Sequence, residues 1–261
     1  MNALPILTAI TRPVSASINR CELGYLPRRE IDFQKAAAQH AEYEACLAGL
    51  GLRVVSLAPE PDLPDAVFVE DPAIVVGEVA IVTRMGVVSR RPEAESVARE
   101  LARYRPVRWL REPATLDGGD VMHAGSALYV GSSRRTNAAG IRQLADELEP
   151  FGYAMAPVEV RDCLHMKSAC CYLGNETILA NRAWIDPAPF RNLRILDVAP
   201  EEPWAANVLA IGESAILPSC FPATRRILER AGWNVIPVDV SEIMKAEGGV
   251  TCMSLIFEAQ L

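Results

Sequence analysis

The sequence has little of what several large classes of protein require. No run of apolar residues reaches the roughly 18 positions that a membrane-spanning helix needs. The first residues have no basic stretch of the kind that opens a secretory signal. Positive charge is in deficit, because the net charge is −7, whereas nucleic-acid-binding proteins present a basic face. We therefore expect a cytoplasmic chain with no membrane and no nucleic acid as a partner.

Disulfide and metal-binding patterns are also missing. The seven cysteines, an odd number, include no Cys-x-x-Cys pair, so we expect reduced thiols and no zinc site. The 261 residues, half of them apolar, suffice to bury a large core. No linker or low-complexity segment divides the chain, and residues 1–261 are predicted to form a single domain.

What the sequence does contain is a unit that recurs about every 40–50 residues, a spacing typical of propellers and arrays. In four copies a polar residue leads into a short apolar strand, and a glycine five or six positions later indicates a hairpin. These polar residues are Asp71, Asp120, Ser168 and Asn207. Cys252, which follows a Gly-Gly pair, occupies a fifth equivalent place.

Each unit continues with an amphipathic helix and a closing strand. The helices are predicted over residues 33–50, 93–104, 137–148 and 223–231, and the closing strands over 53–57, 107–110, 153–156, 194–198 and 235–238. Pro187 and Pro189 interrupt the third helix. The fifth unit is divided between the chain ends, with its first strand at 253–257 and its second at 6–10.

These units predict an α/β fold, a five-bladed pseudo-symmetric α/β-propeller built from strand–strand–helix–strand repeats. Its first strands would lie at the centre, and their leading polar residues would point into a shared pocket where a small ligand binds.

Three histidines limit the search for an acid or base. His40 falls in a predicted helix and His123 in a predicted strand, where structural roles suffice. His165 lies three residues before Ser168, at the inner end of the third unit. Among the cysteines, Cys252 alone follows a Gly-Gly turn at a strand entrance. Together Cys252 and His165 match the cysteine–histidine pattern of nucleophilic catalysis.

Acidic residues gather at the entrances of the first two units. Turn formation explains part of this pattern, but burying Glu70 with Asp71 before an apolar run is costly unless a cation neutralises them. A guanidinium fits, because its N–H fork matches carboxylates. Arg90 and Arg135, expected at the surface when taken singly, suggest a ligand with a negative end as well, such as a zwitterionic amino acid.

Five motifs in order resemble those of dimethylarginine dimethylaminohydrolase, one of the guanidino-group-modifying enzymes with a five-bladed propeller fold. They are FVED at 68–71, LDGGD at 116–120, GSSRRTN at 131–137, LHMKS at 164–168 and GGVTC at 248–252. The resemblance spans nearly the whole chain. It implies Cys252 as nucleophile and His165 as general acid and base, with Asp117, already a candidate to orient the histidine, as its support.

The same resemblance implies a set of binding residues. Glu70 and Asp71 would hold the guanidinium, and Arg90 and Arg135 the carboxylate. Asp65 and the backbone of Leu23 and Ala246 would lie near the amino-acid end.

The implied reaction converts Nω-methylated arginines, asymmetric dimethylarginine and monomethylarginine, to citrulline and a methylamine through a covalent cysteine thiouronium. No metal or organic cofactor is required, and a homodimer is compatible with the sequence. The alternatives are an arginine deiminase or amidinotransferase of the same superfamily, or a non-catalytic propeller that binds an amino acid.

Overall fold

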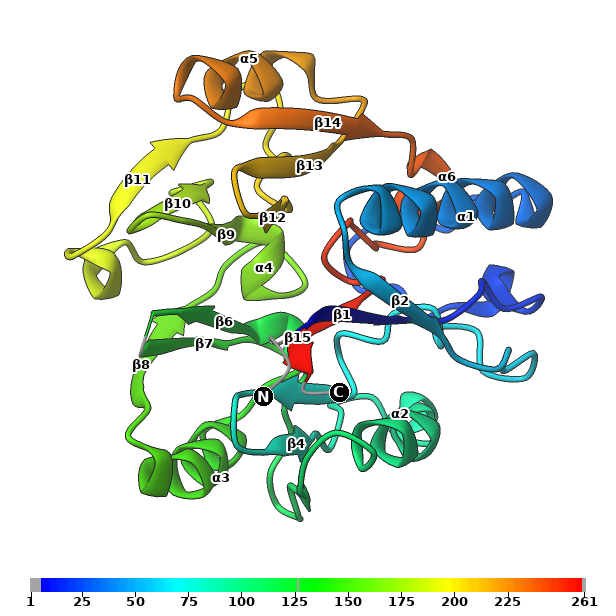
Figure 1. Ribbon diagram of the computed structural model, residues 1–261, viewed down its shortest axis with the longest axis vertical. Helices are drawn as coiled ribbons and strands as arrows, with labels where there is room; N and C mark the ends of the chain where they lie inside the picture. Colours follow the sequence, from blue (N-terminus) through cyan, green and yellow to red (C-terminus); the bar gives the residue numbers. More distant parts are fainter. Residues whose placement is uncertain (1–5, 126, 260–261) are drawn as a thin grey trace, which may run out of the picture.

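The computed structural model describes residues 6–125 and 127–259. Within those ranges fifteen strands form five three-stranded sheets, so the fold is mixed α/β, as predicted. Figure 1 shows the sheets spread around the middle of the molecule in chain order, with the longer helices on the outside. None of the described helices is both long and apolar enough to cross a bilayer.

All five sheets share one topology. The first strand pairs antiparallel with the second, and the second pairs parallel with the third. In this order the sheets are β3 (Ala73–Val75), β4 (Ala80–Val82) and β5 (Val107–Trp109); β6 (Val121–Ala124), β7 (Ala127–Ser132) and β8 (Ala154–Glu159); β9 (Cys170–Gly174), β10 (Thr177–Ala180) and β11 (Arg194–Asp197); β12 (Leu209–Ile211), β13 (Ser214–Pro218) and β14 (Asn234–Val238); and β15 (Leu255–Ala259), β1 (Ile6–Thr11) and β2 (Arg53–Ser56).

Parallel pairing requires a crossover between the second and third strands, and a helix supplies it in four sheets. These helices are α1 (Phe33–Gly49), α2 (Glu93–Leu101), α3 (Ala138–Leu148) and α5 (Pro222–Arg230). Asp32 caps α1 and Asn137 caps α3 through their side-chain oxygens. The third crossover contains only the short turn η5 (Ala188–Phe190), in agreement with its two prolines.

Some predicted boundaries are wrong by a few residues. α2 ends at Leu101 because Arg103 and Tyr104 donate three residues back, which tightens the last turn. β15 begins at Leu255 because the turn continues to Ser254. Ser168 lies in a helix, not at a strand entrance. Short helices not predicted are η1 (Ile18–Arg20), η2 (Val88–Arg90), η3 (Gly118–Asp120), η4 (Glu149–Phe151), α4 (Met166–Ala169) and α6 (Ser241–Met244).

The two ends of the chain meet in one sheet, as predicted. β1 is its central strand and pairs with β15, with Ile10 opposite Leu255. First strands of neighbouring sheets are in contact, namely β15 with β3, β6 with β9, and β9 with β12. The inner strands therefore gather in the middle of the molecule, where their preceding loops place the candidate site.

Helix α1 is tied to the loop that carries Cys252. The buried Tyr43 hydroxyl donates to the carbonyl of Val250 at 2.7 Å and lies 2.7 Å from the Ser254 hydroxyl. One outer helix thereby fixes both sides of the cysteine.

Candidate active site

The loop before Cys252 needs its two glycines because other residues pack against their Cα atoms. A Cβ on Gly248 would overlap the Phe68 ring, and a Cβ on Gly249 would overlap the Asn207 amide. That amide also holds the backbone N–H of Thr251 at 3.1 Å and its hydroxyl at 3.0 Å. The sequence therefore places the cysteine by close packing rather than by a flexible turn.

Cys252 is one of the residues that line a cavity of about 430 Å³. The Cys252 sulfur accepts the Gly249 N–H at 3.3 Å. Burial, and then the charges of Glu70 and Asp71, raise the pKa of the thiol. The raised pKa favours the neutral thiol, and a positive charge beside the sulfur would favour the thiolate.

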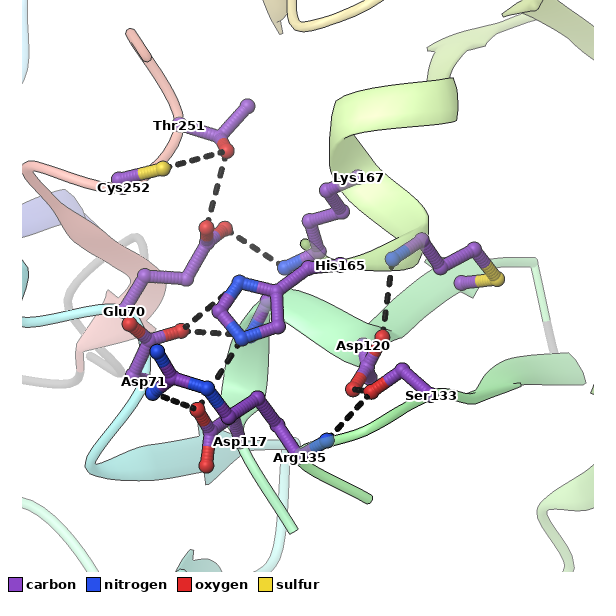
Figure 2. A network of polar contacts seen from close by, with 12 residues as sticks. Glu70, Asp71, Asp117, Asp120, Ser133, Arg135, His165, Lys167, Thr251 and Cys252 are labelled. Atoms are coloured by element: carbon purple, nitrogen blue, oxygen red, sulfur yellow. Dashed lines mark hydrogen bonds and ion pairs between the residues drawn. The ribbon is translucent and has the colours of Figure 1, made fainter. Parts of the chain in front are cut away.

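His165 is buried at the start of α4, and Figure 2 shows it among the acidic residues. Its Nε2 lies 3.0 Å from Asp117 Oδ2 and its Nδ1 lies 3.8 Å from Asp71 Oδ1. Burial lowers the pKa of the imidazole, but the neighbouring carboxylates outweigh burial and raise the pKa to about 9. Among the described residues no hydrogen bond joins His165 to Cys252.

The supports of this histidine come from three loops. Asp117 accepts the Gly86 N–H at 2.8 Å. A Cβ on Gly119 would lie 2.6 Å from His165 Nδ1, so only glycine fits there. Asp120, expected to face the shared pocket, is instead fully buried and binds the chain itself. It accepts the Ser133 hydroxyl (Figure 2), and it also accepts the Thr136 hydroxyl and the Met166 N–H.

The acid pair is neutralised by cations of the chain. Glu70 pairs with Lys167 Nζ at 2.6 Å and accepts the Thr251 hydroxyl at 2.9 Å. Asp71 pairs with Arg90 Nη1 at 2.7 Å. The sequence-based interpretation assigned this role to a ligand and did not anticipate these two cations of the chain. Despite these ion pairs, the pKa of Glu70 is raised and the pKa of Asp71 is lowered.

Burial raises the pKa of Glu70 although Lys167 opposes it. Burial also acts on Asp71, but His165, Arg90 and the Gly119 N–H outweigh it and lower its pKa to about 2. Asp71 therefore keeps its negative charge throughout the ordinary pH range.

Both arginines are buried, so the expectation that each lies at the surface was wrong. Arg90 donates from Nε and Nη2 to Glu93, at 3.1 and 2.9 Å. Arg135 Nη1 is 3.5 Å from Asp117 Oδ2 and has no hydrogen-bond partner. A buried donor without a partner is costly, so Arg135 is suited to receive an anion.

The remaining predicted residues lie around this network. Asp65 is buried and accepts the Glu22 N–H at 3.1 Å. Burial raises its pKa although Arg90 opposes the shift. Leu23 packs against the apolar cluster that contains Ala246, and Cys252 packs against the same cluster.

Sequence reasoning missed Lys167, Thr251, Glu93 and Glu247, all of which make polar contacts in or beside the site. Lys167 and Thr251 are each adjacent in sequence to a leading polar residue, a signal that could have found them. Glu93 and Glu247 have no comparable signal.

Asp71, Asp117 and His165 also offer three ligand atoms within 4.8 Å of one another. Arg90 and Arg135 lie beside the same carboxylates and already supply positive charge there. The cluster thus fits proton transfer better than a resident metal.

Comparison with known proteins gives consistent results. The profile of the arginine deiminase family matches residues 33–175. The N(G),N(G)-dimethylarginine dimethylaminohydrolase of Pseudomonas aeruginosa is 38% identical over 87% of this chain and 90% of its own length. Its namesake from Streptomyces coelicolor is 37% identical over 97% of each chain. A Pseudomonas aeruginosa structure, with cysteine replaced by serine and citrulline bound, has a TM-score of 0.92 at 35% identity and covers 97% of this chain and 100% of that one.

Five small sheets that gather a cysteine, a buried histidine–aspartate pair and two buried acids define a guanidino-group-modifying enzyme. Within this class the chain belongs to the dimethylarginine dimethylaminohydrolase family, and it is a hydrolase.

Proposed function

We propose that this chain hydrolyses asymmetric dimethylarginine and monomethylarginine to citrulline and the corresponding methylamine. The observation that carries the proposal is that the Thr251 hydroxyl joins Cys252 to the buried Glu70, while His165 lies beside the adjacent Asp71. The family of the chain and the citrulline bound to its Pseudomonas aeruginosa relative support the same substrate class.

We also propose that residues 1–261 form one domain, a five-bladed α/β-propeller. A cavity of about 300 Å³ is lined by residues from the first strand of every sheet, β3, β6, β9, β12 and β15. This shared lining supports a central axis. The cavity that contains Cys252 would lie at one end of that axis.

In the proposed complex the substrate guanidinium lies near Glu70 and Asp71. The unpartnered Nη1 of Arg135 supports a place for the substrate carboxylate. The guanidinium nitrogens of Arg90 already donate hydrogen bonds to Glu93 and Asp71. Arg90 would therefore act on the substrate carboxylate through its charge more than through direct hydrogen bonds. Asp65 and the backbone of Leu23 and Ala246 would border the α-amino end.

The chemistry begins when the bound guanidinium lowers the pKa of Cys252 and the thiol releases its proton to water. The thiolate attacks the guanidinium carbon, forming the C–S bond. Protonated His165 gives its proton to the departing amine as the C–N bond breaks, which leaves a thiouronium. Neutral His165 then takes a proton from water, and the hydroxide attacks the same carbon. The C–S bond breaks, the sulfur takes up the hydroxyl proton, and neutral citrulline leaves with the thiol restored. Asp117 and the acid pair stabilise the positive charge in both steps.

The decisive experiment is a mass spectrum of the enzyme quenched during turnover of dimethylarginine. We expect an adduct on the peptide that contains Cys252. Cys252→Ala should bind the substrate and produce no citrulline. Normal turnover in this variant would refute the assignment.

Arginine deiminase and amidinotransferase activities begin with the same attack, and the arginine deiminase profile matches the chain. Arginine, monomethylarginine and dimethylarginine should be assayed together for citrulline and the released amine. Preference for arginine would favour the deiminase. Tight binding of dimethylarginine without citrulline formation would favour a non-catalytic sensor.

A further inference from the structure

One wall of the Cys252 cavity comes from a short segment between η1 and α1. Tyr25 and Leu26 of this segment line the cavity together with Glu247, Gly249 and Cys252. The 24–26 segment, Gly24 to Leu26, therefore forms part of the wall of the cavity that contains Cys252.

The carboxylate of Glu247 holds the 24–26 segment by its backbone. Three consecutive N–H groups donate to it: Gly24 at 2.9 Å, Tyr25 at 2.6 Å and Leu26 at 2.5 Å. Successive N–H groups directed at one anion form a strong binding nest. Glu247 has a φ of 59°, a left-handed conformation that is unfavourable for glutamate. These hydrogen bonds offset that cost.

The segment also touches the neighbours of two other site residues. The Arg134 guanidinium lies 5.5 Å from the centre of the Tyr25 ring, and Arg134 precedes Arg135. A Cβ on Gly24 would lie 3.5 Å from Leu164, which precedes His165. Closure of the 24–26 segment is thus linked to the loops that carry the proposed carboxylate ligand and the proposed acid.

We propose that Glu247 is a positioning residue that holds the 24–26 segment closed and thereby fixes the place of the substrate's α-amino end. This inference rests on the proposed function, which puts the backbone of Leu23 and Ala246 at that end. Leu23 directly precedes the segment and Ala246 directly precedes Glu247, so the same hydrogen bonds fix both. Without the carboxylate the three N–H groups turn to water, and only the closed fraction of molecules binds the α-amino group.

The test compares Glu247→Ala and Glu247→Gln with Glu229→Ala, which removes a carboxylate paired with Arg225 on the surface of α5. The substrates are asymmetric dimethylarginine and its analogue without the α-amino group. If closure falls to about one tenth of the molecules, KM for dimethylarginine rises about tenfold in Glu247→Ala. In that variant kcat and the KM of the analogue change little. Glu247→Gln, which keeps one oxygen acceptor, lies between wild type and Glu247→Ala, and Glu229→Ala matches wild type.

A second readout does not depend on turnover. Peptide-resolved hydrogen exchange should be faster across residues 22–29 in Glu247→Ala and unchanged in Glu229→Ala. Unchanged exchange there, or an equal rise of KM for both substrates, would overturn the inference. If wild type makes no citrulline from either substrate, the proposed function fails, and hydrogen exchange still decides whether Glu247 holds the segment.

Discussion

Burial, and then the charges of two neighbouring acids, raise the pKa of Cys252 and favour its neutral form. These acids are Glu70, which forms an ion pair with Lys167, and Asp71, which forms an ion pair with Arg90. A bound cationic ligand would lower that pKa and favour the reactive thiolate. Reactivity is thereby coupled to the charge of the substrate, not to the thiol alone.

Removing one acid should therefore make the thiol more reactive. Glu70→Gln eliminates a negative charge beside Cys252, so the thiol pKa falls and more thiolate is present at a given pH. We expect faster alkylation of Cys252 by iodoacetamide at pH 8 together with slower turnover. The rate is followed on the Cys252 peptide by mass spectrometry, with the exposed Cys220 as internal reference. Slower alkylation in Glu70→Gln would contradict this account.

His165 should act as an acid up to moderately alkaline pH. Its pKa of about 9 keeps the imidazolium populated below that value, and the proton is lost as pH rises through it. Asp117→Asn removes a carboxylate beside Nε2, so the pKa of His165 should decrease. Titration of the ring by NMR measures the shift directly. Loss of the oriented acid should slow turnover about 10²-fold to 10⁴-fold; an unchanged titration would refute the role of Asp117.

At the scale of elements, the outer helices position the inner loops. Tyr43 of α1 spans from the helix to Val250 and Ser254, on either side of Cys252. Tyr43→Phe removes the hydroxyl and leaves the Val250 carbonyl buried without this donor. We expect a loss of about 1–3 kcal/mol in the free energy of unfolding and a lower kcat. Urea denaturation and steady-state kinetics measure the two effects, and Tyr172→Phe, on β9, serves as a matched control.

The order of strands and helices within each unit could be predicted from the sequence. Hydrophobic period, glycine spacing and helix lengths predicted the strand–strand–helix–strand units, because these signals are local. The polar residue before Val121, at the start of β6, was recognised, but the direction of its side chain was not. The Asp120 carboxylate is buried within the chain because groups on other elements, such as the Thr136 hydroxyl and the Met166 N–H, donate hydrogen bonds to it.

Across the whole molecule, the contacts that sequence reasoning missed join different sheets or distant loops. Lys167 meets Glu70 from 97 positions away, and Glu247 meets Gly24 from 223 positions away. Such pairs depend on how the sheets are placed around the centre, which no local pattern records. A cationic partner for the acid pair was anticipated correctly, but its source was not.

The two ends of the chain are joined by β1, the central strand of the sheet that they form. Ile10 is fully buried there, opposite Leu255 and beside Val55 of β2. Because β15 directly follows the Cys252 loop, loosening this sheet should destabilise the site along with the core. Ile10→Ala should cost about 2–5 kcal/mol of unfolding free energy, whereas Val88→Ala, 68% exposed, should cost little.

If the sheets form one cooperative domain, urea unfolding of Ile10→Ala should give a single transition. Tryptophan fluorescence reports on Trp184 and Trp204, which pack together far along the chain from β1, and thiol labelling reports on Cys252. Both signals should shift to the same lower urea concentration, because loss of β1 pairing propagates around contacting first strands. Labelling of Cys252 well before the fluorescence change would instead show that the sheet of the two termini opens independently of the others.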